Sequence, residues 1–277
     1  MHNQNYENHS FEIKKRIIEG AYNCGETCHI GGALSMVDFM SVLYGSIIKI
    51  NPQDLCDPTR DIFILSKGHC VLGYFATLNH FGLISDDTFR TFQKNGSDLI
   101  AHPVKNIKLG MESSNGSLGQ GLSFALGQAL GMRYEKEDNR HVYVLMGDGE
   151  CNEGSVWESA ASAAEFKTTN LTSIIDVNLM RNDGENSIFE GIENIQKIWS
   201  AFGWNTIVVD GHNHSEILKA LIKSKENKTK PSAILLQTIK GKGISFMENN
   251  NDWHHNRITR KIYDQILSEW KNIDNNR

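Results

Sequence analysis

Apolar and β-branched residues gather in short runs that predict the strands of a parallel sheet, and the run at 142–146, which contains no turn residue, predicts a strand buried on both faces. The runs cover residues 61–65, 142–146, 171–175, 204–209 and 233–238. Most of the segments between them place apolar residues at helical spacing. Because strands and helices alternate, we expect right-handed crossovers and an α/β fold, with a doubly wound, mostly parallel sheet flanked by helices.

The helical pattern also indicates where individual helices begin. The first helix carries Ile13 on its apolar face and has Ser10 as its expected N-cap. Ser35 and Asp38 form a capping-box-like start for the next helix. The expected helices after the first cover residues 36–47, 70–79, 85–94, 157–166, 192–202, 215–222 and 259–270, and a further helix opens after the glycine-rich stretch at 114–121 with Leu122, Leu126, Ala129 and Leu130 on its face.

Composition narrows the class of protein. The chain has 277 residues, 39% hydrophobic and 22% charged, which suits one large domain over residues 1–277. A net charge of -5 without a basic patch argues against a nucleic-acid partner. No apolar run approaches the roughly 18 residues of a membrane span, so we expect a cytoplasmic protein without a membrane partner. Its five cysteines are an odd number without a repeating frame, which favours free thiols in a reducing compartment.

Two polar residues follow neighbouring strands of the predicted sheet. Asp148 stands between two glycines directly after the strand at 142–146, and Asn178 follows the strand at 171–175. Parallel strands open their ligand crevice at their carboxyl ends, so both side chains are expected at the same edge. Mg²⁺ prefers oxygen ligands and takes only one or two carboxylates. The pair therefore suggests a diphosphate bound through Mg²⁺, whereas Gly-Asp-Gly on its own is also a common turn.

Three glycine-containing turns carry further candidate residues. Residues 66–69 join a strand to a helix and end in His69, so they either bind an anion or form a capping turn with a solvated histidine. The dense glycines at 114–121 let the backbone approach a ligand closely. Cys24, Cys28 and His29 lie in the third turn, but a zinc site needs four ligands in paired short spacings and no second pair is present.

Together these motifs resemble the amino-terminal half of the transketolase family, from about residue 10 to the end of the chain. The motifs occur in the family's order: His29 before Ile-Gly-Gly-Ala-Leu-Ser, Ser-Lys-Gly-His ending at His69, His102-Pro103, Gly-Ser-Leu-Gly-Gln-Gly at 116–121, the Asp148 and Asn178 pair, Lys-Gly-Lys-Gly-Ile-Ser-Phe-Met-Glu-Asn-Asn at 240–250, and Trp253-His254. Dehydrogenase α-subunits share the Asp and Asn signature but not this set of histidines. The resemblance implies a fold that binds thiamine diphosphate.

The resemblance also implies which residues bind that cofactor and its Mg²⁺ ion, for which Ca²⁺ or Mn²⁺ can substitute. The implied metal ligands are the side chains of Asp148 and Asn178 and the main-chain oxygen of Met180. The implied cofactor contacts are His69, Gly116, Ser117, Leu118 and Gly149. Glu153 matches an acidic residue that lies, in the family, at the subunit interface between the two cofactors.

Three histidines match those of the family's substrate channel. The resemblance implies that His29, His102 and His254 bind sugar hydroxyls and move protons at the carbonyl that is formed or broken. Neutral imidazole near pH 7 is suited to both tasks. We expect five other histidines to be either solvated or in the core. They are His80, His141, His212, His214 and His255.

Three positions depart from the family pattern. Cys28 and Ala101 stand where glycine usually precedes a channel histidine, and a β-carbon there would narrow the channel or change the donor that fits. Arg181 is more basic than the usual residue after the asparagine ligand. Its side chain therefore either contacts a phosphate or carboxylate or faces solvent.

A full transketolase is more than twice this long, and its second half holds the pyrimidine-binding domain with the glutamate that activates the cofactor. The resemblance therefore implies an amino-terminal subunit that works with a separate carboxyl-terminal subunit, in an α2β2 assembly. The implied reaction is the cofactor's covalent transfer of a two-carbon ketol unit from a ketose or ketose phosphate to an aldehyde. The family's sugar-phosphate-binding arginines lie mostly in the second half, so the substrate sugar is not identified.

Two other functions remain open at the level of the sequence. One is another thiamine-diphosphate lyase or synthase that makes an unusual sugar, such as a relative of deoxyxylulose-phosphate synthase, or a dehydrogenase α-subunit. The histidine set argues against the last two. The other is a non-catalytic scaffold that regulates a partner, although a scaffold has no need for metal ligands and channel histidines together.

Overall fold

The computed structural model describes residues 5–135, 140–185, 189 and 191–275. Its main sheet has five strands in the order β1-β2-β3-β7-β6, and every neighbouring pair is parallel. The strands are β1 (Ile62–Leu65), β2 (Val142–Gly147), β3 (Leu171–Val177), β6 (Asn205–Asp210) and β7 (Ser232–Gln237). All five were predicted from the apolar runs, and the expected doubly wound parallel sheet is confirmed.

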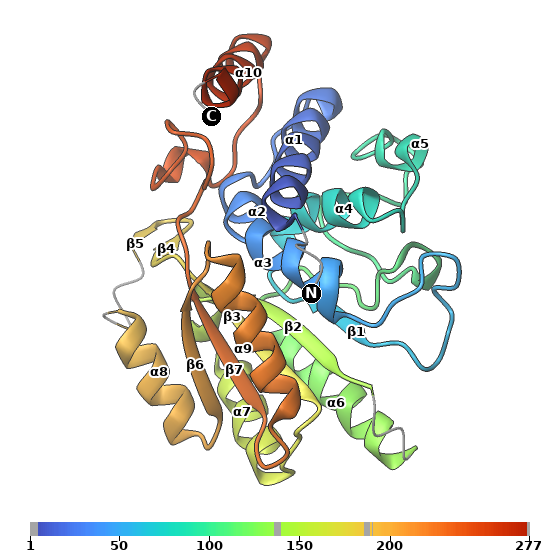
Figure 1. Cartoon of the computed structure of the whole chain (residues 1–277), viewed down its shortest axis with the longest axis vertical. Coiled ribbons are helices and arrows are strands. Elements are labelled where there is room, and N and C mark those ends of the chain that lie inside the picture. The colour runs from blue at the N-terminus through green and yellow to red at the C-terminus, as the bar shows by residue number, and fades with distance from the viewer. Residues whose placement is uncertain (1–4, 136–139, 186–188, 190, 276–277) are drawn as a thin grey trace.

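Helices cover both faces of this sheet (Figure 1). One core contains side chains from α1 (Tyr6–Cys24), α2 (Gly31–Ser35), α3 (Val37–Val42), α4 (Val71–His80), α9 (His214–Glu226) and α10 (Arg260–Asn275). The other contains side chains from α6 (Gln120–Tyr134), α7 (Gly154–Glu165) and α8 (Ile192–Ala201). Successive side chains of β1 point to opposite faces of the sheet and so belong to different cores. Phe63 belongs to the first core and Ile64 to the second.

The expected cap of the first helix is wrong. Helix α1 begins earlier, and the side chain of Asn5 accepts the N–H of Asn8 at 3.1 Å. Ser10 lies inside the helix, buried, and donates to Ser41. An asparagine is as good an N-cap as serine, and residues 6–9 contain no helix breaker, so the helix extends back to the asparagine.

The expected start of the second helix is also wrong. Ser35 ends α2, and its hydroxyl donates to Asp176 on β3 at 2.6 Å instead of capping a helix. The expected single helix at 36–47 is instead α3 followed by a π-helical turn at Leu43–Ile47. The serine hydroxyl is used by a buried carboxylate from a distant strand, which no local pattern could show.

The expected helix at 85–94 is shorter than predicted. Helix α5 covers only Asp86–Phe89, and Ser85 caps it by accepting the N–H of Thr88 at 3.2 Å. Gln93 has a positive φ of 56°, and its N–H bonds to the carbonyl of Leu99 at 2.8 Å. The chain therefore turns back on itself instead of continuing the helix.

The carboxyl ends of the strands meet at the edge that faces the top of Figure 1. There β1 leads into a 3-10 turn at Gly68–Cys70, and β2 leads into another at Gly149–Asn152. Strand β3 leads into an antiparallel hairpin made by β4 (Met180–Arg181) and β5 (Gly184–Glu185). Two short 3-10 turns, Ile107–Leu109 and Asn251–Trp253, are the remaining elements.

In the described part of the chain, no helix is both long and apolar enough to cross a membrane.

Candidate functional site

A pocket of about 390 Å³ opens at this edge of the sheet. Nine of the residues predicted for the site line it: His29, His69, Gly116, Leu118, Asp148, Gly149, Asn178, Met180 and His254. They come from segments far apart in the sequence, which the parallel sheet brings to one edge. His102, Ser117 and Glu153 were also predicted but do not line this pocket.

The predicted metal ligands form a compact set of oxygen donors. Asp148 is buried, and its two carboxylate oxygens accept the N–H groups of Gly149 at 2.7 Å and Leu179 at 2.6 Å. The side-chain oxygen of Asn178 accepts the N–H of Met180 at 3.1 Å. Between these two residues Leu179 has a φ of 57°, a conformation that non-glycine residues rarely adopt and that is concentrated at functional sites.

The chemistry of this donor set suits a hard divalent cation. Burial, and next the charge of Asp176, raise the pKa of Asp148 to about 6, so the carboxylate is poorly solvated and would gain from a bound cation. One carboxylate, one amide and one main-chain carbonyl are the kinds of ligand that Mg²⁺ accepts. Over the described ranges, no three or more His, Cys, Asp or Glu side chains are grouped to hold a metal ion, as a zinc site would require.

A buried ion pair supports the floor of the pocket. Lys67 is 1% exposed and pairs with Asp176, and it also donates to the carbonyl of Gly32 at 2.9 Å. Burial alone would raise the pKa of Asp176, but the Lys67 ammonium and two hydroxyls, one from Ser35, hold the pKa of that carboxyl below its usual value. Asp176 was not among the predicted site residues, although an aspartate inside an apolar strand is a signal for a buried partner.

Glu150 holds the glycine-rich loop against the strand ends. It is 2% exposed and accepts the N–H of Gly119 at 2.9 Å, the N–H of Gly147 at 3.3 Å and the hydroxyl of Ser66. A β-carbon on Gly121 would lie 2.2 Å from the Ser66 hydroxyl, so glycine is needed at that position. Sequence reasoning missed this glutamate, which immediately follows the Gly-Asp-Gly turn.

Histidine rings gather at the same pocket as the predicted metal ligands. The ring centre of His29 lies 5.1 Å from that of His69, 5.3 Å from that of His254 and 6.1 Å from that of His102. His102 thus joins the cluster although it does not line the pocket. Against expectation, the exposed His255 also belongs to it, with its ring centre 4.4 Å from that of His29.

The imidazoles of His29, His69, His102 and His254 are neutral at pH 7. Burial lowers the pKa of His29 to about 3 and the pKa values of His69 and His254 to about 4. Burial also lowers the pKa of His102 below its ordinary value. The Lys240 ammonium donates to Nδ1 of His254 at 2.8 Å, so that imidazole carries its proton on Nε2. Its N–H can therefore donate a hydrogen bond to a substrate oxygen.

Four other histidines make structural contacts outside the pocket. His141 is buried and bonds the hydroxyl of Thr172 at 2.7 Å, and His212 bonds Asp38 at 2.8 Å. His214 and His80 also bond to side chains away from the pocket. These contacts agree with the solvated or core roles expected for them.

The remaining predicted residues lie at the surface next to the pocket. Ser117 and Glu153 are both exposed, and a β-carbon on Gly119 would lie 2.6 Å from that of Glu153. Arg181 also lines the pocket. Its Cγ would lie 2.9 Å from a β-carbon on Gly149, so its side chain passes over the turn that follows β2.

The geometry agrees with comparisons to known proteins. Residues 16–270 match the family model described as transketolase, thiamine diphosphate binding domain. This chain belongs to the transketolase family. It corresponds to the amino-terminal, thiamine-diphosphate-binding part of a transketolase, as the motifs predicted.

Two curated relatives match almost end to end. The chain is 36% identical to a subunit of the apulose-4-phosphate transketolase of Phocaeicola vulgatus, over 92% of this chain and 90% of that protein. It is also 36% identical to the 6-deoxy-6-sulfo-D-fructose transketolase subunit SqwG of a Clostridium species, over 93% of each chain. Both relatives are named as subunits.

A solved structure confirms the fold. The transketolase from Leishmania mexicana superposes with a TM-score of 0.86 at 26% identity. The match covers 96% of this chain but only 41% of that transketolase. The chain therefore spans about two fifths of the solved relative.

Proposed function

We propose that this chain is the amino-terminal subunit of a thiamine-diphosphate-dependent transketolase. In this proposal it transfers a two-carbon ketol unit from a ketose or ketose phosphate to an aldehyde, and it is active only with a separate subunit that carries the pyrimidine-binding domain. The observation that carries the proposal is the placement of the Asp148 and Asn178 oxygens and the neutral histidines around one pocket. That combination suits a metal-bound diphosphate next to a sugar carbonyl.

The pocket residues would divide the binding of the cofactor among them. Asp148, Asn178 and the carbonyl of Met180 would hold Mg²⁺, or Ca²⁺ or Mn²⁺ in its place. His69, Gly149 and residues 116–118 would contact the cofactor. A diphosphate bound to Mg²⁺ still carries negative charge, and Lys240 and the guanidinium of Arg181 line the same pocket. When bound, thiamine diphosphate supplies the nucleophilic carbon that takes up the two-carbon unit.

The histidines would position the sugar and move its protons. Since His29 and His102 are neutral at pH 7, each can accept a proton at one nitrogen or donate one from the other. His254 presents a donor on Nε2, because Lys240 occupies its Nδ1. A hydroxyl or carbonyl oxygen next to the cofactor is the group it would bind.

Exposed apolar side chains near the site support a protein partner. Ile100 is 43% exposed and Val104 47%, on either side of His102 in the sequence, and Leu179, beside the proposed metal ligands, is 37% exposed. A subunit seated over the pocket would cover these side chains and complete the cofactor site. We propose an α2β2 assembly in the cytoplasm, in keeping with five cysteines that are all free.

The relatives favour an uncommon sugar as substrate. One is named for apulose-4-phosphate and the other for 6-deoxy-6-sulfo-D-fructose. We therefore propose a sugar or sugar phosphate outside the common pentose phosphates, with neither nucleic acid nor membrane as a partner. A thiamine-diphosphate synthase that makes an unusual sugar is the second candidate.

Reconstitution tests the proposal. The chain should be co-purified with a polypeptide that supplies the pyrimidine-binding domain, and ketol transfer measured with thiamine diphosphate and Mg²⁺ over a panel of ketoses and aldehydes. We expect transfer by the pair and none by either polypeptide on its own. Turnover by the rigorously purified single chain would refute the need for a partner. Cofactor binding by the pair without turnover on any sugar would favour the scaffold function.

A further inference from the structure

Two cysteine thiols lie next to each other at the end of α1. The Sγ atoms of Cys24 and Cys28 are 3.5 Å apart. Cys24 is the last residue of the helix, and Gly25 follows it in the left-handed conformation with a φ of 72°. That turn sends the chain back past the helix end, which brings the second thiol beside the first.

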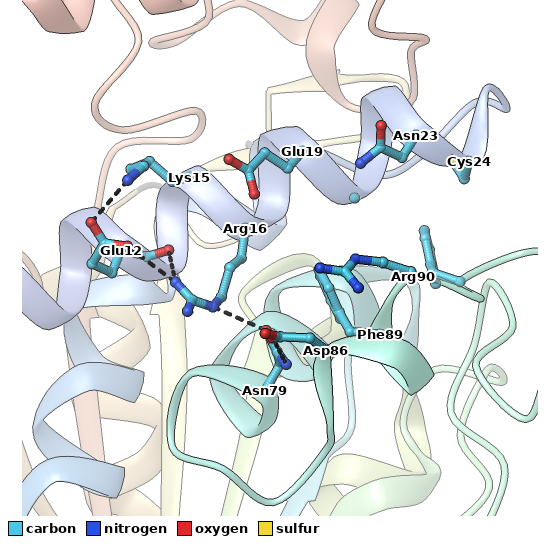
Figure 2. A pocket seen from close by; sticks show the side chains of 12 residues that line it. Glu12, Lys15, Arg16, Glu19, Asn23, Cys24, Asn79, Asp86, Phe89 and Arg90 are labelled. Atoms are coloured by element: carbon cyan, nitrogen blue, oxygen red, sulfur yellow. Dashed lines mark hydrogen bonds and ion pairs between the residues drawn. The ribbon is translucent and has the colours of Figure 1, made fainter.

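The two thiols differ in their surroundings. Cys28 is buried, with 3% of its surface exposed, and its sulfur accepts a hydrogen bond from the Gln93 amide at 3.4 Å. Cys24 is half-buried and opens onto a polar pocket between α1 and α5, which contains the side chains of Arg16 and Arg90 (Figure 2). A small oxidant can therefore reach Cys24 before Cys28.

The electrostatics favour Cys24 as the reacting thiol. The hydrogen bond between the two sulfurs lowers the pKa of Cys24 to about 7, so a substantial fraction is thiolate near neutral pH. The same hydrogen bond, together with burial, raises the pKa of Cys28. The pair thus consists of an accessible thiolate and a buried thiol that remains protonated.

Cys28 also connects this pair to the histidine cluster. It directly precedes His29, and it forms a two-bond backbone bridge with Asn256: its N–H donates to the Asn256 carbonyl at 2.9 Å and its carbonyl accepts the Asn256 N–H at 3.0 Å. Asn256 follows His254 and His255. The bridge therefore holds the segment of His29 against the segment of His254 and His255.

We propose that Cys24 and Cys28 form a reversible disulfide, made by a peroxide and broken by a dithiol reductant, that lowers turnover by displacing His29. The Cys24 thiolate attacks one peroxide oxygen, the O–O bond breaks, and the other oxygen leaves as hydroxide. The sulfur of Cys28 then attacks the resulting sulfenic acid, the S–O bond breaks, and the S–S bond forms. The Cys28 proton and the expelled hydroxyl leave as water. Two thiols are oxidised as the peroxide is reduced by two electrons.

In this proposal, closing the disulfide moves Cys28 and the segment that carries His29. A disulfide is about 2 Å long, so the sulfurs must approach by more than 1 Å. Cys28 then moves toward the helix end, away from Gln93 and its bridge to Asn256. Asp148 and Asn178 lie on other segments, so cofactor binding should survive the oxidation. The chemistry of the pair stands on its own geometry, whereas the effect on turnover rests on the proposed function.

Thiol mapping tests the chemistry. The reduced chain is treated with hydrogen peroxide, alkylated, and analysed by peptide mass spectrometry. We expect the peptide containing both cysteines to lose two hydrogens and to resist alkylation, with recovery after a dithiol is added. The Cys24→Ser and Cys28→Ser variants should fail to form this product, and Cys56→Ser, which removes an exposed thiol, should behave as wild type. Free Cys24 and Cys28 at a peroxide dose that oxidises Cys56 would overturn the proposal.

Hydrogen exchange and turnover test the consequence. We expect faster amide exchange at Cys28 and Asn256 in the oxidised chain, and a several-fold loss of turnover in the reconstituted enzyme with unchanged cofactor affinity. Reduction should restore the original exchange rates and the original turnover. The Cys24→Ser variant should keep its turnover in peroxide. A disulfide that leaves both exchange and turnover unchanged would refute the switch. If the reduced enzyme has no ketol transfer, the proposed function fails, while the exchange measurement still decides the effect of the disulfide.

Discussion

The ammonium of Lys240 lies 2.8 Å from Nδ1 of His254 and fixes which nitrogen of that imidazole carries the proton. The same ammonium is also held by the side chain of Asn251 at 2.8 Å and by the carbonyl of Arg181 at 3.3 Å. Lys240 is 2% exposed, so these contacts are protected from solvent. A loop residue thereby controls the tautomer of a proposed channel histidine.

Replacing Lys240 should change the titration of His254. Burial lowers the pKa of His254 to about 4, and the Lys240 ammonium adds to that effect. In Lys240→Met we expect the pKa of His254 to rise toward its ordinary value. The acidic limb of the pH profile of kcat, where kcat falls at low pH, should then move to higher pH. Lys242→Met, which removes a more exposed lysine paired with Glu248, is the matched control. An unchanged acidic limb would show that Lys240 does not set this titration.

Substitution of a proposed metal ligand should affect cofactor binding, whereas substitution of a proposed channel histidine should affect turnover. Asp148→Ala removes the carboxylate of the donor set, so we expect Mg²⁺-dependent binding of thiamine diphosphate to weaken by more than about 100-fold. His102→Ala should bind the cofactor nearly as wild type but turn over more slowly. Isothermal calorimetry with Mg²⁺ and steady-state kinetics of the reconstituted pair measure the two effects.

Asp183 provides the control for that comparison. It lines the same pocket but its side chain is 75% exposed and lies outside the proposed ligand set. Asp183→Ala should bind cofactor close to wild type. Equal affinities for Asp148→Ala and the wild type would remove the metal assignment.

Loss of Glu150 should destabilise the protein. Its carboxylate accepts the N–H groups of buried Gly119 and half-buried Gly147, and leaving them unpaired should lower the free energy of unfolding by about 3 kcal/mol. Glu150→Gln keeps one acceptor oxygen and should cost less. Urea unfolding measures the change, and the exposed Glu153→Ala should stay within about 0.5 kcal/mol of wild type. If Glu150→Ala matched the wild-type midpoint, the loop would not depend on this carboxylate.

The buried histidines should make stability depend on pH. Burial lowers the pKa of His29 from its ordinary value of 6.5 to about 3, so below pH 6.5 the unfolded chain binds a proton that the folded chain does not. The stability that this neutral histidine contributes is complete above pH 6.5 and is lost as the pH falls toward 3. From pH 7 to pH 5, His29→Asn should therefore lose less free energy of unfolding than wild type. Between pH 7 and pH 8 the two should respond alike, and equal losses below pH 6.5 would contradict the assigned shift.

Much of the fold followed from patterns that are local in the sequence. The apolar runs marked β1, β2, β3 and β7 because a strand buried on both faces tolerates few polar residues, whereas the edge strand β6 keeps an apolar run although most of its residues are partly exposed. Parallel pairing then required Asp148 and Asn178 to emerge at one edge, whatever the distance between them along the chain. The resemblance placed the histidine motifs, and the structure brings His29, His69 and His254 to the same pocket.

Other features depended on contacts that no local pattern contains. The hydroxyl of Ser35 bonds Asp176 rather than capping a helix, and Ser10 packs inside α1 because the helix begins after Asn5. His255 was expected to be a solvated or core residue. In the structure its ring lies beside that of His29, because the loop that carries it folds back onto that segment.

The sequence by itself determined the class of fold, the edge of the sheet at which the candidate site lies and the kinds of side chain found there, because the strand pattern and parallel pairing follow from residue type and order. Only the tertiary structure decided which of those side chains are charged and which touch. The neutral state of His254 and the meeting of Cys24 with Cys28 depend on burial and on the path of the chain between elements. Desolvation and close contact are properties of the packed molecule, and the order of residues alone does not specify them.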